Sequence, residues 1–216
     1  MIKVHPLEAA AAAAAPSLSL PSFPSSPSSS SNYITSRKET FTVWMKSLVM
    51  QGNGCTVYDE NGEIVYRIDN YDKKCSNEVC IMDLQGKVLF TILKKNQWFF
   101  RRWVGDRYND LNLNTEKFHF QVRKSLRNIV KGDLSCQVIC VNGQTSCYRV
   151  KGLAAGKSAF QITEENGKLV AEAKRKESSS GVLLGEDVLA LEVEAHVDHC
   201  LIMALVTVYG LLHNTL

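Results

Sequence analysis

Hydrophobic and polar residues alternate in short runs through most of the chain, which is the period of β-strands and not of helices. The first run, residues 40–45, is rich in β-branched and aromatic side chains, as a half-buried strand should be. The last, residues 189–194, places Leu189, Leu191 and Val193 on one face and polar or small residues on the other. The pattern predicts a mainly β domain.

A repeated motif predicts how these strands are connected. Residues 57–68 resemble residues 81–92, and residues 162–173 are a weaker copy. Each copy has two strand patterns separated by a turn that contains a glycine, which adopts positive φ at little cost and is typical of β-hairpins. Asn142-Gly143 separates a further pair of strand patterns. Successive hairpins form an antiparallel meander, and closing it into a barrel removes the exposed sheet edges.

The last apolar run, residues 200–212, has no polar face. Thirteen helical residues rise only ~20 Å, whereas a transmembrane helix needs roughly twenty residues. We therefore predict no transmembrane span but a helix at about 198–212, with Asp198 as its N-cap, enclosed by the barrel. Met203, Leu205 and Val206 are expected to be buried.

The first 39 residues differ in composition from the rest. An alanine run at 9–15 is followed by four prolines among serines, so few large apolar groups are available for a core. We predict a disordered tail at 1–39 and one domain at 40–216. A chloroplast transit peptide stays open as an alternative, since the tail is serine-rich and acid-poor, although such peptides usually carry more arginine.

Composition narrows the function. With 25 basic and 22 acidic residues, the formal charge of +3 does not favour general nucleic-acid binding. Seven cysteines, an odd number, favour a reducing compartment such as the cytoplasm. The pairs Cys75/Cys80 and Cys136/Cys140 lack the spacing of zinc motifs, and residues 196–200 are interpreted as a helix start. The sequence contains no catalytic or cofactor motif, so we predict neither enzyme activity nor a cofactor or metal.

One basic and aromatic stretch, residues 94–107, is the candidate binding site. Lysines beside tryptophans suit an anionic headgroup at a membrane surface. Alternation places Arg101 with Trp103 on one face and Arg102 on the other. The competing interpretation is a strand pair whose aromatics fill the barrel while its charges are solvated at the rim. The candidate lipid-binding residues are Lys94, Lys95, Arg101, Arg102 and Arg107.

Several stretches in order resemble the LURP-one-related family of plants. They cover nearly all of residues 40–212, and their ordered spacing makes the match specific. These stretches are 42–48, 54–62, 66–71, 78–87, 121–125, 170–176, 185–188 and 203–206. The resemblance implies a Tubby-like fold, a closed antiparallel barrel of about twelve strands around a C-terminal helix, shared with Tubby proteins and phospholipid scramblases. This chain departs from the family at Ala195-His196, where a Pro-Gly pair commonly stands.

The family has no established enzymatic activity, and the resemblance links some members to plant defence. Lipid binding or membrane tethering is implied only through the distant relatives, and fold alone does not carry function. Two hypotheses follow: a non-enzymatic module that binds anionic phospholipid headgroups or protein partners, and a scramblase-like protein with its helix in the bilayer. We expect a monomer in the cytoplasm, at a membrane surface or in the nucleus, with the chloroplast as alternative.

Overall fold

The computed structural model describes residues 33–45, 54–69, 78–97, 100–107, 119–124, 134–139, 145–152, 158–185 and 187–212. These residues form twelve strands and one helix. The strands are β1 (Glu39–Trp44), β2 (Gly54–Tyr58), β3 (Ile64–Asp69), β4 (Glu78–Met82), β5 (Val88–Gln97), β6 (Phe100–Arg107), β7 (His119–Lys124), β8 (Leu134–Ile139), β9 (Thr145–Gly152), β10 (Ser158–Glu164), β11 (Leu169–Arg175) and β12 (Val188–Val193). The helix is α1 (His199–Leu212).

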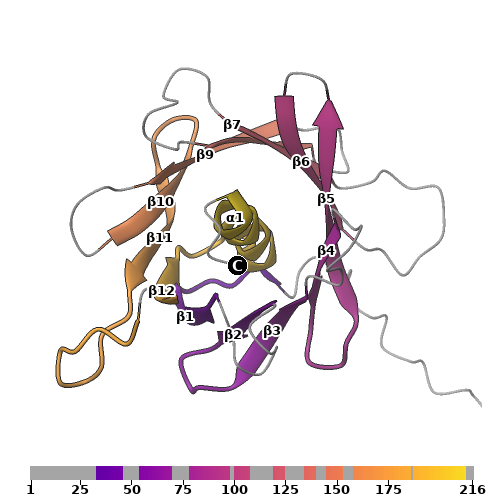
Figure 1. Ribbon diagram of the computed structural model, residues 1–216. Helices are drawn as coiled ribbons and strands as arrows, with labels where there is room; N and C mark the ends of the chain where they lie inside the picture. The colour runs from indigo at the N-terminus through magenta and orange to yellow at the C-terminus, as the bar shows by residue number, and fades with distance from the viewer. Residues whose placement is uncertain are drawn as a thin grey trace, which may run out of the picture. The chain divides into compact units, whose positions relative to one another are not determined.

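The strands form a closed antiparallel barrel, as the sequence predicts (Figure 1). Each strand pairs with its neighbours in the chain, and β1 pairs with both β2 and β12, which closes the ring. Phe41 lies opposite Leu191 across the closing pair, and both side chains are buried. The two runs predicted as the first and last strands therefore meet.

The three predicted repeats are hairpins with the same turn. In each turn a glycine with φ between 80° and 86° donates its backbone N–H to the backbone carbonyl of the acidic residue three positions earlier. These glycines are Gly62, Gly86 and Gly167. The Asp59 carboxylate accepts from the backbone N–H groups of Asn61 (2.9 Å) and Glu63 (2.8 Å), and these bonds to the charged form lower its pKa. Acidic residues at these positions therefore stabilise turns.

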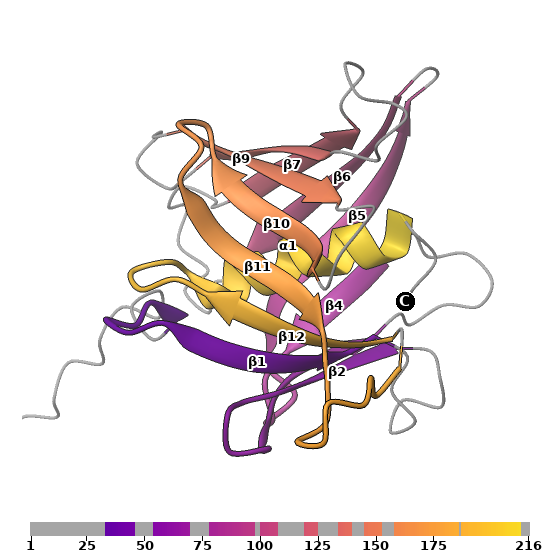
Figure 2. The same cartoon turned by 90° about the vertical axis from the view of Figure 1, so that its left-hand side faces the viewer.

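Helix α1 fills the barrel (Figures 1 and 2). Met203 is fully buried, and Leu205 and Val206 are each 1% exposed, which confirms the predicted burial. The one hydroxyl in the middle of the helix, that of Thr207, donates to the Met203 carbonyl (2.8 Å) and so does not lie unpaired in the apolar core. Within the described residues, no helix is long and apolar enough to cross a bilayer.

The direction of α1 distinguishes two ends of the barrel. At the N-end, where α1 begins, lie the three repeated hairpin turns and residues 33–35. At the C-end, where α1 finishes, lie the end of β5, the start of β6 and the connection from β11 to β12 (Figure 2). Charged residues that are neighbours in sequence can therefore lie at opposite ends.

The chain enters α1 through an unusual residue. His196 has φ 64°, a conformation that glycine adopts most readily. The resemblance described above implies a glycine at this position, and the positive φ of His196 is a conformation that suits glycine. The His196 backbone N–H donates to the Thr35 carbonyl (2.7 Å), which ties this turn to the segment before β1.

Candidate functional site

Two of the five predicted lipid-binding residues lie side by side on the outer face of the barrel. Lys95 on β5 lies directly opposite Arg102 on β6. Lys95 is exposed and Arg102 is half-buried, whereas the next residue, Trp103, is buried. Because successive side chains of a strand point to opposite faces, a buried Trp103 places Arg102 outside.

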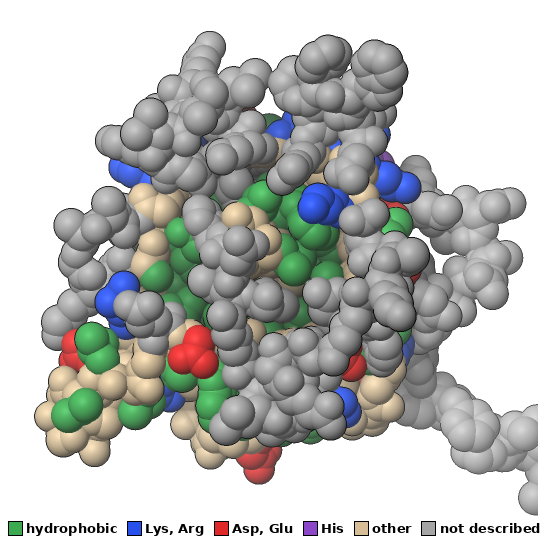
Figure 3. All heavy atoms as spheres, viewed as in Figure 1, with side chains coloured by type: hydrophobic (Ala, Val, Ile, Leu, Met, Phe, Trp, Pro, Cys, Tyr) green, Lys and Arg blue, Asp and Glu red, His purple; other side chains and the backbone are tan. Residues whose placement is uncertain are grey.

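The register extends this pair into a row. Arg102 lies opposite Arg123 on β7, which lies opposite Ser135 on β8, which lies opposite Arg149 on β9. Arg123 and Arg149 are exposed, and their neighbours Val122 and Val150 are buried. We call the four basic residues of this line, Lys95, Arg102, Arg123 and Arg149, the basic row. It begins near the C-end, at the end of β5 and the start of β6, and runs obliquely over the outer face to Arg149, which lies opposite Thr163 beside the β10–β11 turn. Figure 3, which views the barrel from the C-end, shows several lysine and arginine side chains.

The basic row lacks acidic partners in the part of the chain that the structure describes. Neither an ion pair nor a side-chain hydrogen bond joins any of the four to another described residue, and the buried Arg102 Nε has no hydrogen-bond partner there. Like charges ~5 Å apart repel by about 0.8 kcal/mol even in bulk water, so opposed cations destabilise a sheet. The alignment therefore costs stability unless an anion offsets it.

Lys94 lies on the inner side of the same strand pair. It pairs with Trp103, and its Nζ lies 5.8 Å from the centroid of the Trp103 ring, within the range of a cation–π contact. Its position at the C-end keeps the ammonium close to the rim of the barrel. The Arg101 backbone pairs with Asn96, but its side chain lies outside the described part of the structure, as do Trp98 and Phe99.

Arg107 lies apart from the others, at the N-end. Its guanidinium forms an ion pair with Asp198 and lies over the Phe90 ring, 4.8 Å from the centroid. Both charged side chains are 15% exposed. The other Asp198 oxygen accepts from the Leu201 backbone N–H (3.1 Å), so Asp198 is the predicted N-cap. The geometry gives Arg107 a structural role at the start of the helix.

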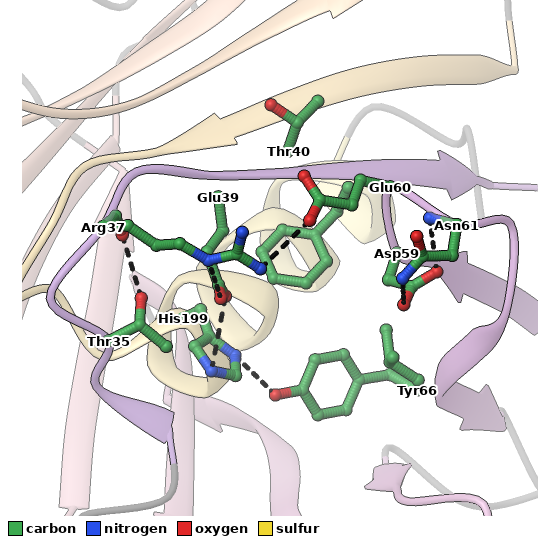
Figure 4. A pocket seen from close by; sticks show the side chains of 11 residues that line it. Thr35, Arg37, Glu39, Thr40, Asp59, Glu60, Asn61, Tyr66 and His199 are labelled. Atoms are coloured by element: carbon green, nitrogen blue, oxygen red, sulfur yellow. Dashed lines mark hydrogen bonds and ion pairs between the residues drawn. The ribbon is translucent and has the colours of Figure 1, made fainter.

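A cavity of 260 Å³ at the N-end is the second candidate site (Figure 4). His199 lies at its base, and its Nδ1 is 2.6 Å from the Tyr66 hydroxyl. Its Nε2 is 3.8 Å from a carboxylate oxygen of Glu39. On the rim, Arg37 binds Glu60 (3.0 Å). The cavity is smaller than the roughly 300–1,000 Å³ of typical ligand pockets.

Burial controls the protonation of these groups. It lowers the pKa of His199 and raises the pKa of Tyr66. The phenol therefore keeps its proton. In the imidazole tautomer whose Nε2–H faces Glu39, the phenol donates to Nδ1. Burial also raises the pKa of the neighbouring Cys200 thiol, so it is not an activated nucleophile. Residues 196–200 form the predicted helix start, and no cluster of metal ligands occurs among the residues described.

Sequence reasoning missed Arg123 and Arg149. Arg123 is the one lysine or arginine on the outer face of its strand-like run, and Arg149 shares its outer face with Lys151 alone, so neither stands out in the sequence. The period of two predicts which face a side chain takes, but only the register shows that the four basic residues form one line.

Comparisons with known proteins identify the family. The LURP-one-related family model matches residues 39–210. Protein LURP-one-related 4 of Arabidopsis thaliana is 49% identical over 183 residues, covering 85% of this chain and 82% of that protein. Protein LURP-one-related 11 of the same plant is 40% identical over 191 residues, with coverage of 85% and 82%.

A solved structure agrees with the fold. The crystal structure of an Arabidopsis thaliana protein superposes with a TM-score of 0.53 at 16% identity, covering 84% of this chain and 95% of the other. At that identity the likeness concerns the fold alone. The match of the family model to most of the barrel and the identity of the relatives show that the chain belongs to the LURP-one-related family.

Proposed function

We propose that this protein is a non-catalytic module that binds anionic phospholipid surfaces through the basic row. The observation that carries the proposal is the alignment of Lys95, Arg102, Arg123 and Arg149 in one line without acidic partners among the described residues. Phosphate groups of a membrane supply the missing counter-charge, at about 1 kcal/mol for each basic residue near the surface. Arginine also binds phosphate through two parallel hydrogen bonds.

The proposal modifies the site predicted from the sequence. It keeps Lys95 and Arg102, adds Arg123 and Arg149, and leaves Lys94 at the rim as an additional cation. The proposed lipid-binding site no longer includes Arg107, because this residue is paired with Asp198 at the other end of the barrel. Family membership supports a role without catalysis, and the resemblance extends the proposal to membrane tethering in plant defence signalling.

The alternative is a scramblase-like protein that moves phospholipids with α1 in the bilayer. The position of α1 weighs against it, since residues 200–208 are at most 4% exposed inside the barrel. Withdrawing the helix would expose its own apolar surface and that of the barrel interior, at about 25 cal/mol for each Å². A binding module needs no such rearrangement.

Vesicle co-sedimentation tests the proposal. The wild-type chain is expected to sediment with vesicles of phosphatidylcholine and phosphatidylserine but not with phosphatidylcholine alone, and raising the salt concentration should weaken the binding. The double variant Arg123→Gln/Arg149→Gln should bind the anionic vesicles about tenfold to thirtyfold more weakly.

A matched pair of charges provides the control. Lys38 and Lys87 are exposed at the N-end, before β1 and in the β4–β5 turn, so Lys38→Gln/Lys87→Gln removes the same net charge away from the basic row. This variant should bind like the wild type. An equal loss in both variants would mean that net charge and not the row attracts the membrane, and equal binding to both vesicle types would refute the proposal.

A further inference from the structure

The connection between β11 and β12 projects from the C-end of the barrel and carries three exposed apolar residues on the branch that returns to β12, directly after the Ser178–Gly181 turn. We call these three residues the apolar tip. Val182, Leu183 and Leu184 are consecutive and are 63%, 51% and 52% exposed. Figure 3 shows hydrophobic side chains gathered on this projection, at the lower left. We call the described residues 176–185 and 187 the arm. Three adjacent apolar side chains on a projecting tip are unusual, because exposed large hydrophobic residues normally occur singly.

The arm has a defined conformation that presents this tip. The Ser178 backbone N–H donates to the Val182 carbonyl (2.7 Å), and the Ser178 hydroxyl accepts from the Val182 N–H (3.1 Å). The Leu184 N–H donates to the Lys176 carbonyl (3.0 Å). The apolar side chains are thus held outward by a bonded turn, which lowers the entropy lost when the tip binds.

The base of the arm is anchored to the barrel wall. The Lys176 N–H donates to the Val188 carbonyl (3.0 Å), and the Met45 N–H donates to the Asp187 carbonyl (2.8 Å). The Trp44 indole N–H donates to the Asp187 carboxylate (2.9 Å). These bonds fix the direction in which the arm leaves the barrel.

The arm and the beginning of the basic row lie at the same end of the barrel. Lys95 near the end of β5 and Arg102 near the start of β6 lie at the C-end, and the arm leaves the C-end from β11 and β12 (Figure 2). A flat anionic lipid surface can contact both at once, because Lys95 and Arg102 supply charge on one side of the C-end and the tip supplies apolar surface on another. A compact protein partner would have to span this end of the barrel to do the same.

We propose that the apolar tip of the arm enters the boundary between headgroups and acyl chains when the C-end of the barrel lies on an anionic membrane. This inference rests on the proposed function, since the basic row brings the protein to the membrane. The arm then adds a contribution that salt does not screen, because burial of apolar surface does not depend on charge. Basic residues and an apolar insertion together give the two signals that stable peripheral binding requires.

Fluorescence with the full chain tests insertion. In Leu183→Trp, the added indole should shift its emission to shorter wavelength on mixing with phosphatidylcholine–phosphatidylserine vesicles, and lipids brominated on their acyl chains should quench it. The matched control is Leu84→Trp, because Leu84 is 54% exposed in a hairpin turn at the N-end. The emission of the indole added in Leu84→Trp should not change its wavelength with vesicles, and the brominated lipids should not quench it.

Binding separates this inference from the proposed function. The variant Val182→Ser/Leu183→Ser/Leu184→Ser should bind the anionic vesicles about tenfold more weakly, with the remaining binding more sensitive to salt. If that variant binds as tightly as the wild type while Arg123→Gln/Arg149→Gln loses binding, the insertion of the arm is refuted. Binding through the basic row is then supported. If the wild type binds no vesicles, both are refuted.

Discussion

The guanidinium of Arg107 on β6 is joined to the carboxylate of Asp198, the N-cap of the central helix. The two residues are separated by 91 positions, and their ion pair connects the barrel wall to the start of the helix that fills it. A backbone bridge between Ile34 and Asp198 brings a third segment to the same point. The helix start is therefore fixed by contacts from distant parts of the chain.

Arg107→Met should destabilise the protein and leave vesicle binding unchanged. The substitution leaves the Asp198 carboxylate without its cation in a largely buried position, at a cost of about 2–4 kcal/mol in the free energy of unfolding. Urea denaturation gives this value. Arg102→Met, on the outer face, should stay within about 0.5 kcal/mol of the wild type. Equal effects of the two substitutions would contradict the structural role of Arg107.

The sequence predicts the fold better than it predicts the site. Alternation and the three hairpin glycines, Gly62, Gly86 and Gly167, are local signals, and a helix without a polar face requires an enclosure. These signals together were sufficient for a barrel around a helix. The fold therefore follows from patterns that lie within a few residues of one another.

The site depends on relationships that local patterns do not contain. Lys94 and Lys95 are adjacent in sequence, yet one lies against Trp103 and the other lies outside beside Arg102. Arg123 joins Arg102 only because the register of β6 and β7 places them opposite each other. Which strand neighbours which, and in what register, is decided by the closed barrel as a whole.

Two truncations should separate the tail from the segment that precedes β1. Deleting residues 1–32 removes serine, proline and alanine and should leave the unfolding midpoint unchanged. Deleting residues 1–38 also removes the Thr35 carbonyl that accepts from the His196 N–H, and should destabilise the domain by about 1–3 kcal/mol. Thermal unfolding of both proteins checks this. Identical midpoints would show that the contact of Thr35 contributes nothing.

Gly105 should tolerate no side chain, because a Cβ on it would lie 2.1 Å from the ring of Phe120 on the adjacent strand. Phe120 is fully buried and contacts Phe90, so the ring has little room to move. Gly105→Ala should cost about 1–3 kcal/mol of overpacking in urea denaturation. Combining it with Phe120→Leu should cost less than the sum of the two single changes, since the smaller side chain relieves the clash. Strict additivity would show that the two sites are independent.

His199 should make the protein less stable as the pH falls below 6.5, the usual pKa of histidine. Burial lowers the pKa of His199 below its ordinary value of 6.5, although Glu39 and Asp198 oppose the shift. Below pH 6.5 His199 is therefore protonated in the unfolded chain while it stays neutral in the folded chain. The free energy of unfolding falls as the pH drops toward the pKa of the folded state. The slope can reach about 1.4 kcal/mol for each pH unit.

His199→Gln removes this titration, and Gln can still accept a hydrogen bond from Tyr66. Urea denaturation at several pH values should therefore give a flatter profile for His199→Gln than for the wild type. His196→Asn is the matched control, because asparagine tolerates the φ of 64° and the substitution leaves His199 in place. It should keep the slope of the wild type. A wild-type slope that persists in His199→Gln would assign the pH dependence to groups outside the cavity at the N-end.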